Sequence, residues 1–215
     1  FKRDHVLLLA ADLRSGNENA SPAQRSSLRH QLLERLRAVP GVRLASASEL
    51  TPISGAGWNN DIKADGFTPA VRDDGLVWMN EVSEGYFSTM GTALITGRDF
   101  NTSDVPGSPK VAIVNEAFAK KFNLGRNAVG KHMSMGNDSL NVEIIGLAKD
   151  AKYSEVKDVI PPVFTQPYQQ SGRLGGLTFY LRSRLPTDQT FRAIRDVMRR
   201  IDPNLPVEEL KTMPQ

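Results

Sequence analysis

The sequence predicts an α+β fold in which two βαβ halves of the ferredoxin-like type are separated by a β-rich insertion. Two observations support this: a capped amphipathic helix lies between two strands near each end of the chain, and the middle is rich in short strands. A helix with one apolar stripe packs on one face of a sheet, so both units can share a four-stranded sheet with the helices on the same side. We therefore predict one subdomain from residues 1–54 and 150–215, and an inserted subdomain from residues 55–149.

The first βαβ unit begins with the apolar run of residues 5–12, which is short enough for a buried strand. Ser21 predicts the start of a helix, because it can act as the cap, a proline follows it, and Gln24 comes three residues later. The apolar face of this helix consists of Leu28, Leu32, Leu33, Leu36 and Val39. A Pro-Gly pair ends the helix, and residues 42–50 predict the second strand.

Four arginines lie on the same helix: Arg25, Arg29, Arg35 and Arg37. A group of like charges on one helix is usually a solvated face, so we interpret them as the outer surface of the helix.

The middle of the chain starts with residues 51–60, whose Gly, Ser, Pro and Asn content predicts an exposed connection. Strands are predicted at residues 61–66 and 76–82, around a turn at 72–75. Residues 82–122 then predict a compact packing unit of short helix, strand, turn, strand and short helix. We expect Ser83 to cap the first of these helices and Gly91 to end it, and Asn115 to cap the second and Gly125 to end it.

Further strands are predicted at residues 129–135 and 141–148, and a helical turn at 150–158. Residues 163–168 contain Pro167, which lacks an amide hydrogen, so we expect a short edge segment. The second βαβ unit follows, with a strand at 177–182, a helix that starts at residues 186–188, and a last strand at 207–210. Its helix has apolar residues at helical spacing: Phe191, Ile194, Val197, Met198 and Ile201.

Composition excludes several classes of function. The chain has no cysteine, which excludes disulfides, thiol chemistry and thiolate metal sites. The formal net charge of +3, with no run of like charges, gives no reason to expect a nucleic-acid partner. No apolar run approaches the about 20 residues of a membrane span, and no signal-peptide pattern occurs. Because the chain begins with Phe1, we expect a piece of a longer polypeptide or a processed product.

Residues 125–132 (GRNAVGKH) nearly match a phosphate-binding loop. His132, however, stands where such a loop needs a Ser or Thr hydroxyl to hold Mg²⁺. The segment also follows a predicted helix instead of a buried strand. We therefore interpret it as a helix-ending glycine followed by a turn.

No other motif indicates chemistry. The three histidines share no ligand spacing: His5, His30 and His132. The paired carboxylates lie in predicted turns: Asp61 with Asp65, and Asp73 with Asp74. An oxygen-ligated cation is the alternative there, but turns favour Asp without any metal. We predict no catalytic, cofactor-binding or metal-binding residue.

Aromatic residues concentrate in the insertion: Trp58, Phe67, Trp78 and Tyr86. Such a group either fills a small β-rich core or forms an exposed surface for a partner or ligand. We favour the core.

The order and spacing of several segments resemble the periplasmic core domain of MacB-type ABC transporter permeases. The matching segments are residues 82–91 (VSEGYFSTMG), 94–100 (LITGRDF), 111–116 (VAIVNE), 130–131 (GK), 143–150 (EIIGLAKD), 161–164 (PPVF) and 202–207 (DPNLPV). The resemblance covers most of the chain.

This resemblance implies a non-catalytic domain on the periplasmic side of the cytoplasmic membrane, between the first two transmembrane helices of a permease. It implies a porter-like part of two βαβ units and an inserted β-rich part called sabre. The implied partners are the permease's own transmembrane helices, a fused or separate cytoplasmic ATPase, and a periplasmic adaptor or lipoprotein. It implies no cofactor. We expect hydrophobic segments on both sides of the chain in the full gene, and an isolated domain that is monomeric.

Two other classes of function stay open. A free-standing extracytoplasmic ligand-binding or sensor domain would need a concave pocket with converging polar groups. An enzyme, most plausibly a hydrolase that uses Asp or His residues, finds no supporting constellation in the sequence.

Overall fold

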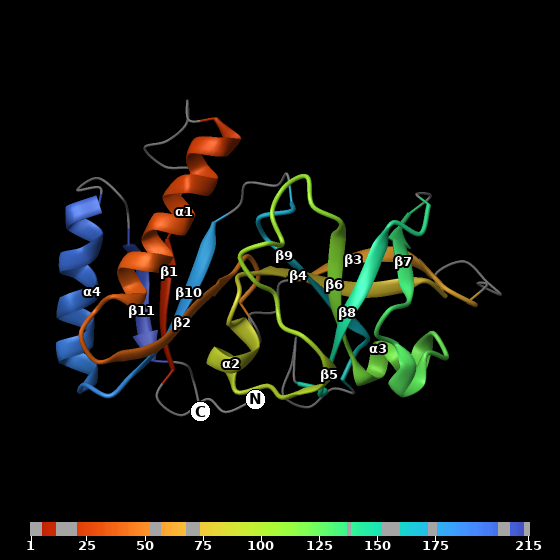
Figure 1. The fold of residues 1–215 in the computed structure, drawn as a ribbon. Helices are drawn as coiled ribbons and strands as arrows, with labels where there is room; N and C mark the ends of the chain where they lie inside the picture. The colour runs from red at the N-terminus through yellow and green to blue at the C-terminus, as the bar shows by residue number, and fades with distance from the viewer. Residues whose placement is uncertain are drawn as a thin grey trace.

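The part of the chain that the computed structural model describes contains eleven strands, four α-helices and one 3₁₀ turn (Figure 1). The structure describes residues 6–11, 21–51, 57–67, 74–136, 139–151, 160–171, 176–201 and 207–212. Predictions that fall on His5, on Asp73, on residues 52–56, on 152–159 or on 202–206 lie outside the described residues.

Four antiparallel strands form what we call the open sheet, in the order β11-β1-β10-β2. This is the strand order of a split βαβ sheet. The strands and their two connecting helices are β1 (Val6–Ala11), α1 (Pro22–Arg37), β2 (Val42–Ser48), β10 (Leu177–Ser183), α4 (Thr187–Ile201) and β11 (Val207–Thr212). Both helices pack on the same face of the open sheet, at the left of Figure 1.

The core between this sheet and its helices contains the apolar stripes that the sequence predicts. Leu32, Leu33 and Leu36 of α1 are fully buried there, together with Ile194 and Met198 of α4. The cap of α1 is also as predicted, because the Ser21 hydroxyl accepts a hydrogen bond from the Gln24 amide and the Gln24 side chain accepts one from the Ser21 amide. Local capping and a single apolar face are therefore sufficient to place this helix.

Six strands close on themselves and form what we call the ring, in the order β4-β3-β7-β8-β6-β9, with β9 pairing back to β4. These are β3 (Trp58–Ala64), β4 (Leu76–Val82), β6 (Lys110–Asn115), β7 (His132–Met135), β8 (Val142–Ala148) and β9 (Val163–Pro167). A further strand, β5 (Leu94–Gly97), pairs with β8. The ring lies at the right of Figure 1.

Two helices complete the ring region: α2 (Tyr86–Met90) and α3 (Glu116–Lys121), with a 3₁₀ turn, η1 (Gly125–Asn127), after α3. Inside the ring, Phe118 and Phe122 of the α3 segment pack against strand residues such as Ile144 and Phe164, all fully or almost fully buried. The ring and the open sheet meet at one strand pair, Ser48 opposite Val82.

The structure corrects the expectation of an edge segment at residues 163–168. β9 pairs in parallel with β4 and antiparallel with β6, and all five of its residues are buried. Pro167 is tolerated because β6 pairs with β9 only at Phe164 and Thr165, so no neighbouring strand on that side needs an amide hydrogen from Pro167. β9 pairs within the ring, although it follows residue 150, where the sequence predicts the return to the first subdomain. The predicted subdomain boundaries stay a prediction.

Three local predictions are wrong. β3 begins at Trp58, so residues 58–60 are strand instead of connection. Ser83 does not cap α2, whose N-cap is Gly85 with a positive φ of 76°, because the Ser83 hydroxyl is used by the Ala47 amide. α3 ends at Lys121, with Phe122 as its C-cap, instead of at Gly125, and Asn123 takes the left-handed conformation that follows the cap, at φ 56°. Gly91 and Asn115 serve as predicted.

Candidate functional site

Polar and aromatic contacts between distant parts of the chain come together at the seam, by which we mean the contact of β2 and β10 with β4 and α2. It joins the open sheet to the ring. The face of the open sheet that is turned away from α1 and α4 packs here against α2 and the outer side of the ring. Val6 and Leu8 contribute from the sheet, and Phe87 and Met90 from α2, all of them buried.

Tyr180 lies at the centre of the seam and is fully buried. Its hydroxyl is 2.8 Å from the Ser48 hydroxyl, and Ser48 in turn donates to the Leu50 carbonyl at 2.7 Å, so Tyr180 is the donor toward Ser48. Its ring meets Tyr86 of α2 edge to face, with centroids 5.8 Å apart. Burial raises the pKa of Tyr180 far above its usual value, so this side chain stays neutral and acts as a packing and hydrogen-bonding element.

Four further hydrogen bonds join the two bodies, each with at least one backbone group as a partner. The Ala47 amide donates to the Ser83 hydroxyl at 2.9 Å, and the Ser83 amide donates to the Ala47 carbonyl at the same distance. The Asn80 side chain both accepts from the Leu50 amide and donates to the Leu50 carbonyl. These paired bonds fix the position of β2 against β4 where only one residue pair of regular strand pairing exists.

Arg37, at the end of α1, holds the seam from the helix side. Its guanidinium donates to the Glu84 carboxylate at 2.7 Å and to the Glu84 carbonyl at 3.0 Å, and also to the Ala45 carbonyl at 3.2 Å. Glu34 accepts a further hydrogen bond at 2.7 Å. Burial alone would lower the pKa of Arg37, but the bonds to Glu84 and Glu34 outweigh it and raise the pKa. One side chain therefore connects α1, β2 and the loop before α2.

The arginines of α1 are thus not a uniform solvated face, as the sequence suggested. Arg35 is exposed, but Arg29 is almost completely buried and lies 3.9 Å from the equally buried Glu49. Arg37 is only 29% exposed. The prediction is wrong for these two arginines because their partners, Glu49 and Glu84, come from segments that helical spacing cannot reveal.

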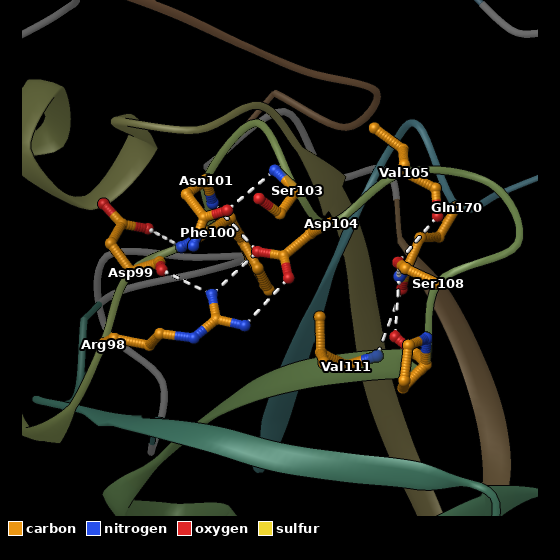
Figure 2. A network of polar contacts seen from close by, with 11 residues as sticks. Arg98, Asp99, Phe100, Asn101, Ser103, Asp104, Val105, Ser108, Val111 and Gln170 are labelled. Carbon is orange, nitrogen blue, oxygen red and sulfur yellow. Dashed lines mark hydrogen bonds and ion pairs between the residues drawn. The ribbon is translucent and has the colours of Figure 1, made fainter.

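A second polar network orders the loop between β5 and β6 (Figure 2). Arg98 makes two parallel hydrogen bonds to Asp104, both of 2.8 Å, and the Asn101 amide donates to the same carboxylate. Burial would raise the pKa of Asp104, but the Arg98 and Asn101 hydrogen bonds outweigh it and lower the pKa. Gln170, which follows β9, donates to Ser108 and Pro109 and accepts from the Val111 amide. The loop is therefore tied to itself and to the ring.

An apolar hollow with a cavity volume of about 70 Å³ lies beside the seam. Tyr86, Phe87 and Met90 of α2 line one side of it. The amides of Asn80 and Asn115 also line it, but both are occupied by backbone groups, of Leu50 for Asn80 and of neighbouring residues for Asn115. The hollow thus offers contact area for an apolar group and little directional hydrogen bonding.

The segment that nearly matches a phosphate-binding loop has a structural role. Residues 125–127 form the 3₁₀ turn after α3, and His132 is the first residue of β7. The Gly130 amide donates to the Ile144 carbonyl, and the Ile144 amide donates to the Lys131 carbonyl. These backbone groups are committed to the pairing of β7 with β8.

The structure brings together two of the polar residues singled out from the sequence, and only loosely. The His132 amide donates to the Asp65 carboxylate at 2.8 Å, and the His132 ring nitrogen lies 3.7 Å from it. His30 is exposed on α1 and lies apart from them. Within the described ranges, no group of three or more His, Asp or Glu side chains is placed to hold a metal ion.

The aromatic residues of the insertion lie in three different cores. Phe67 packs edge to face on Phe122 inside the ring, with centroids 4.6 Å apart. Trp58 and Trp78 are half-buried beside a small apolar group that contains Leu50, and Tyr86 belongs to the seam. These four aromatic residues therefore pack into separate cores and form no joint exposed surface.

The sequence matches a known protein family over most of its length. Residues 7–197 match the family described as "MacB-like periplasmic core domain". No curated protein matches the chain. Among the helices that the structure describes, none combines the length and the apolar character needed to cross a membrane.

Solved structures show the same fold at low identity. The periplasmic region of MacB from Actinobacillus actinomycetemcomitans has a TM-score of 0.59 and 14% identity, over 93% of this chain and 85% of that one. The extracellular domain of the noncanonic ABC-type transporter YknZ from Gram-positive bacteria has a TM-score of 0.59 and 18% identity, over 97% of this chain and 100% of that one.

A domain of a putative permease protein from Porphyromonas gingivalis has a TM-score of 0.55 and 12% identity, over 99% of this chain and 94% of that one. At these identities the structures establish the fold alone, while the family match extends over most of the 215 residues. The chain belongs to the MacB-like periplasmic core domain family.

Proposed function

We propose that this chain is the extracytoplasmic domain of an ABC transporter permease and that it transmits movement from the membrane helices to the ring. The seam is the observation that supports this role. A displacement of the open sheet reaches the ring through Ser83 and Arg37, whose hydrogen bonds of 2.7–3.0 Å to Ala47 and Glu84 join the two bodies. It also reaches the ring through Tyr180, whose ring packs edge to face on Tyr86 of α2. Interfaces of this kind pass small displacements on because packed contacts deform little.

The ATP-hydrolysing subunit and the membrane helices supply the movement in this proposal, and the domain itself catalyses nothing. The ring is the part that contacts cargo, a periplasmic adaptor or a lipoprotein. The two-part division into a porter-like sheet and a sabre-like ring is part of the same proposal, with β9 counted in the ring because of its pairing.

The test uses the full permease with its ATPase in lipid nanodiscs. The chain itself has no cysteine, so once cysteines elsewhere in the transporter are replaced, a single dye can be placed on the ring at Leu140→Cys or on the sheet at Leu185→Cys, both exposed positions. Energy transfer from the dye to acceptor lipids then reports the height of each body above the membrane, with and without ATP.

We expect ATP to change the signal at both positions. Arg37→Met should reduce the change on the ring and keep the change on the sheet, because it removes the bonds to Glu84. Arg35→Met, an exposed position on the same helix, is the matched control and should alter neither. An Arg37→Met permease whose ring responds to ATP like the wild type would refute transmission through the seam.

Ligand binding is the second candidate function, and the apolar hollow is the observation in its favour. The Asn80, Asn115 and Thr165 side chains on its wall are bonded within the protein, and most of its wall is apolar, so its ligand would be a mainly apolar group. A thermal-shift screen of small apolar compounds tests this. A compound that stabilises the wild type but not Met90→Glu, a variant on the wall of the hollow, would support ligand binding there. A screen without hits would refute this second function.

A further inference from the structure

The start of β1 and the end of β11 lie side by side at one end of the open sheet. Val6 of β1 is opposite Arg182 of β10, Leu7 is opposite Thr212 of β11, and Arg182 is opposite Leu44 of β2. The start of β1, the end of β11, the end of β10 and the start of β2 therefore all lie at this end, the lower end of the sheet in Figure 1. If the chain joins membrane helices, as the proposed function requires, it joins them here.

The same end is rich in arginine. Arg43, Arg182 and Arg184 line an open hollow together with Leu44 and Ser183. Arg182 donates to the Thr89 carbonyl of α2 and is partly buried by that contact. Arg43 and Arg184 are exposed, and neither guanidinium has a carboxylate within ion-pair distance among the described residues.

Among the described residues near this end, Asp188 in the first turn of α4 lies 2.6 Å from Arg192, and Glu34 and Glu84 share the single guanidinium of Arg37. These five side chains together carry a charge of −1, against +3 for Arg43, Arg182 and Arg184, so the described side chains around Arg43 and Arg184 leave a net positive charge. Two large apolar side chains flank the arginines and are unusually exposed, Leu44 at 38% and Leu185 at 36%.

We propose that this end of the open sheet rests on an anionic bilayer surface, with Arg43 and Arg184 bound to lipid phosphates and Leu44 and Leu185 in the interfacial region. The proposal rests on the proposed function for its orientation. Arginine binds phosphate with parallel hydrogen bonds, and leucine at the level of the headgroups adds apolar burial. This contact would fix the tilt of the sheet relative to the membrane and so the direction in which the seam is displaced.

The experiment measures binding of the 215-residue chain to vesicles by sedimentation. One set contains phosphatidylglycerol and phosphatidylcholine in equal parts, and the other contains phosphatidylcholine alone. We expect binding to the anionic vesicles only, weakened by salt. Each arginine near such a surface contributes a factor of about five, so Arg43→Gln with Arg184→Gln should weaken binding about 20- to 30-fold. Arg126→Gln with Arg195→Gln removes the same charge at exposed positions of η1 and α4 and should have a much smaller effect.

Orientation is tested with an environment-sensitive dye at Leu185→Cys and, as the matched control, at Leu140→Cys, which is 40% exposed on the β7–β8 side of the ring. Anionic vesicles should shift the emission of the dye at 185 to the blue and leave the dye at 140 unchanged. Equal binding to both kinds of vesicle, equal loss in the two double variants, or equal shifts of the two dyes would each overturn the proposal.

Displacement from the vesicles by inorganic phosphate beyond that caused by sodium chloride of the same ionic strength would also overturn it, since it would indicate a pocket for a free anion. These outcomes can be separated from those of the proposed function. If the chain does not bind vesicles but the dye on the ring still responds to ATP in an Arg37-dependent way, the membrane contact is refuted and the proposed transmission through the seam is unaffected.

Discussion

Arg37 allows a direct measurement of how much the seam contributes to stability, because one guanidinium binds two carboxylates in different surroundings. Both N–O distances are 2.7 Å. The side chain of Glu84 is only 16% exposed, whereas that of Glu34 is 51% exposed. Equal distances and unequal exposure isolate the effect of solvent screening on the two pairs.

The magnitudes follow from these surroundings. An exposed pair three residues apart on a helix contributes about 0.2–0.5 kcal/mol. A charged hydrogen bond contributes about 1.5–3 kcal/mol, which we reduce to about 1–2 kcal/mol for Arg37–Glu84 because Arg37 is 29% exposed. The coupling energy of Arg37 with Glu84 should therefore exceed that with Glu34 by about 1 kcal/mol.

The assay is a pair of double-mutant cycles, Arg37→Met with Glu84→Gln and Arg37→Met with Glu34→Gln, measured by urea unfolding at pH 7. Repeating both in about 1 M salt should remove the coupling to Glu34 and leave most of that to Glu84. Equal couplings, or a coupling to Glu84 that salt removes as completely as that to Glu34, would refute the view that the seam is held by a partly buried contact that solvent and salt screen only weakly.

Three further variants test the end of β5 and the loop between β5 and β6. Because the Arg98 bonds hold the pKa of Asp104 below its usual value, the stability they provide is present above about pH 4 and is lost as the pH falls through the lowered pKa. Asp104→Asn should therefore cost about 1–3 kcal/mol at pH 7 and clearly less at pH 3 in urea unfolding, and a difference that does not change with pH would contradict this. Gly97 and Gly107 both have positive φ, of 82° and 88°, but an added Cβ would strike the Ile145 carbonyl only at Gly97. Gly97→Ala should cost about 3 kcal/mol or more and Gly107→Ala about 1 kcal/mol in thermal unfolding, and equal losses would show that the backbone can shift away from the clash.

Local signals identified most elements because their causes lie within a few residues. Ser21 and Gln24 predict the start of α1, and Asn115 predicts the start of α3, since a cap and its amide are three residues apart. Alternation and apolar runs likewise indicate β1, β4 and β10. The candidate site was not identified in this way, because the partner of Tyr180 is Ser48, 132 positions away, and the partner of Arg37 is Glu84, 47 positions away.

The amino-acid sequence by itself determined the capped helices, their apolar faces, the strand-rich middle and the absence of cysteine. Only the tertiary structure decided that β9 closes the ring, that Ser83 bonds β2 instead of capping α2, and that Arg29 and Arg37 turn inward. The physical reason is the range of the interactions. Caps and helical stripes act within one or two turns, whereas a strand's neighbours and a buried charge's partner are fixed only when remote segments pack together.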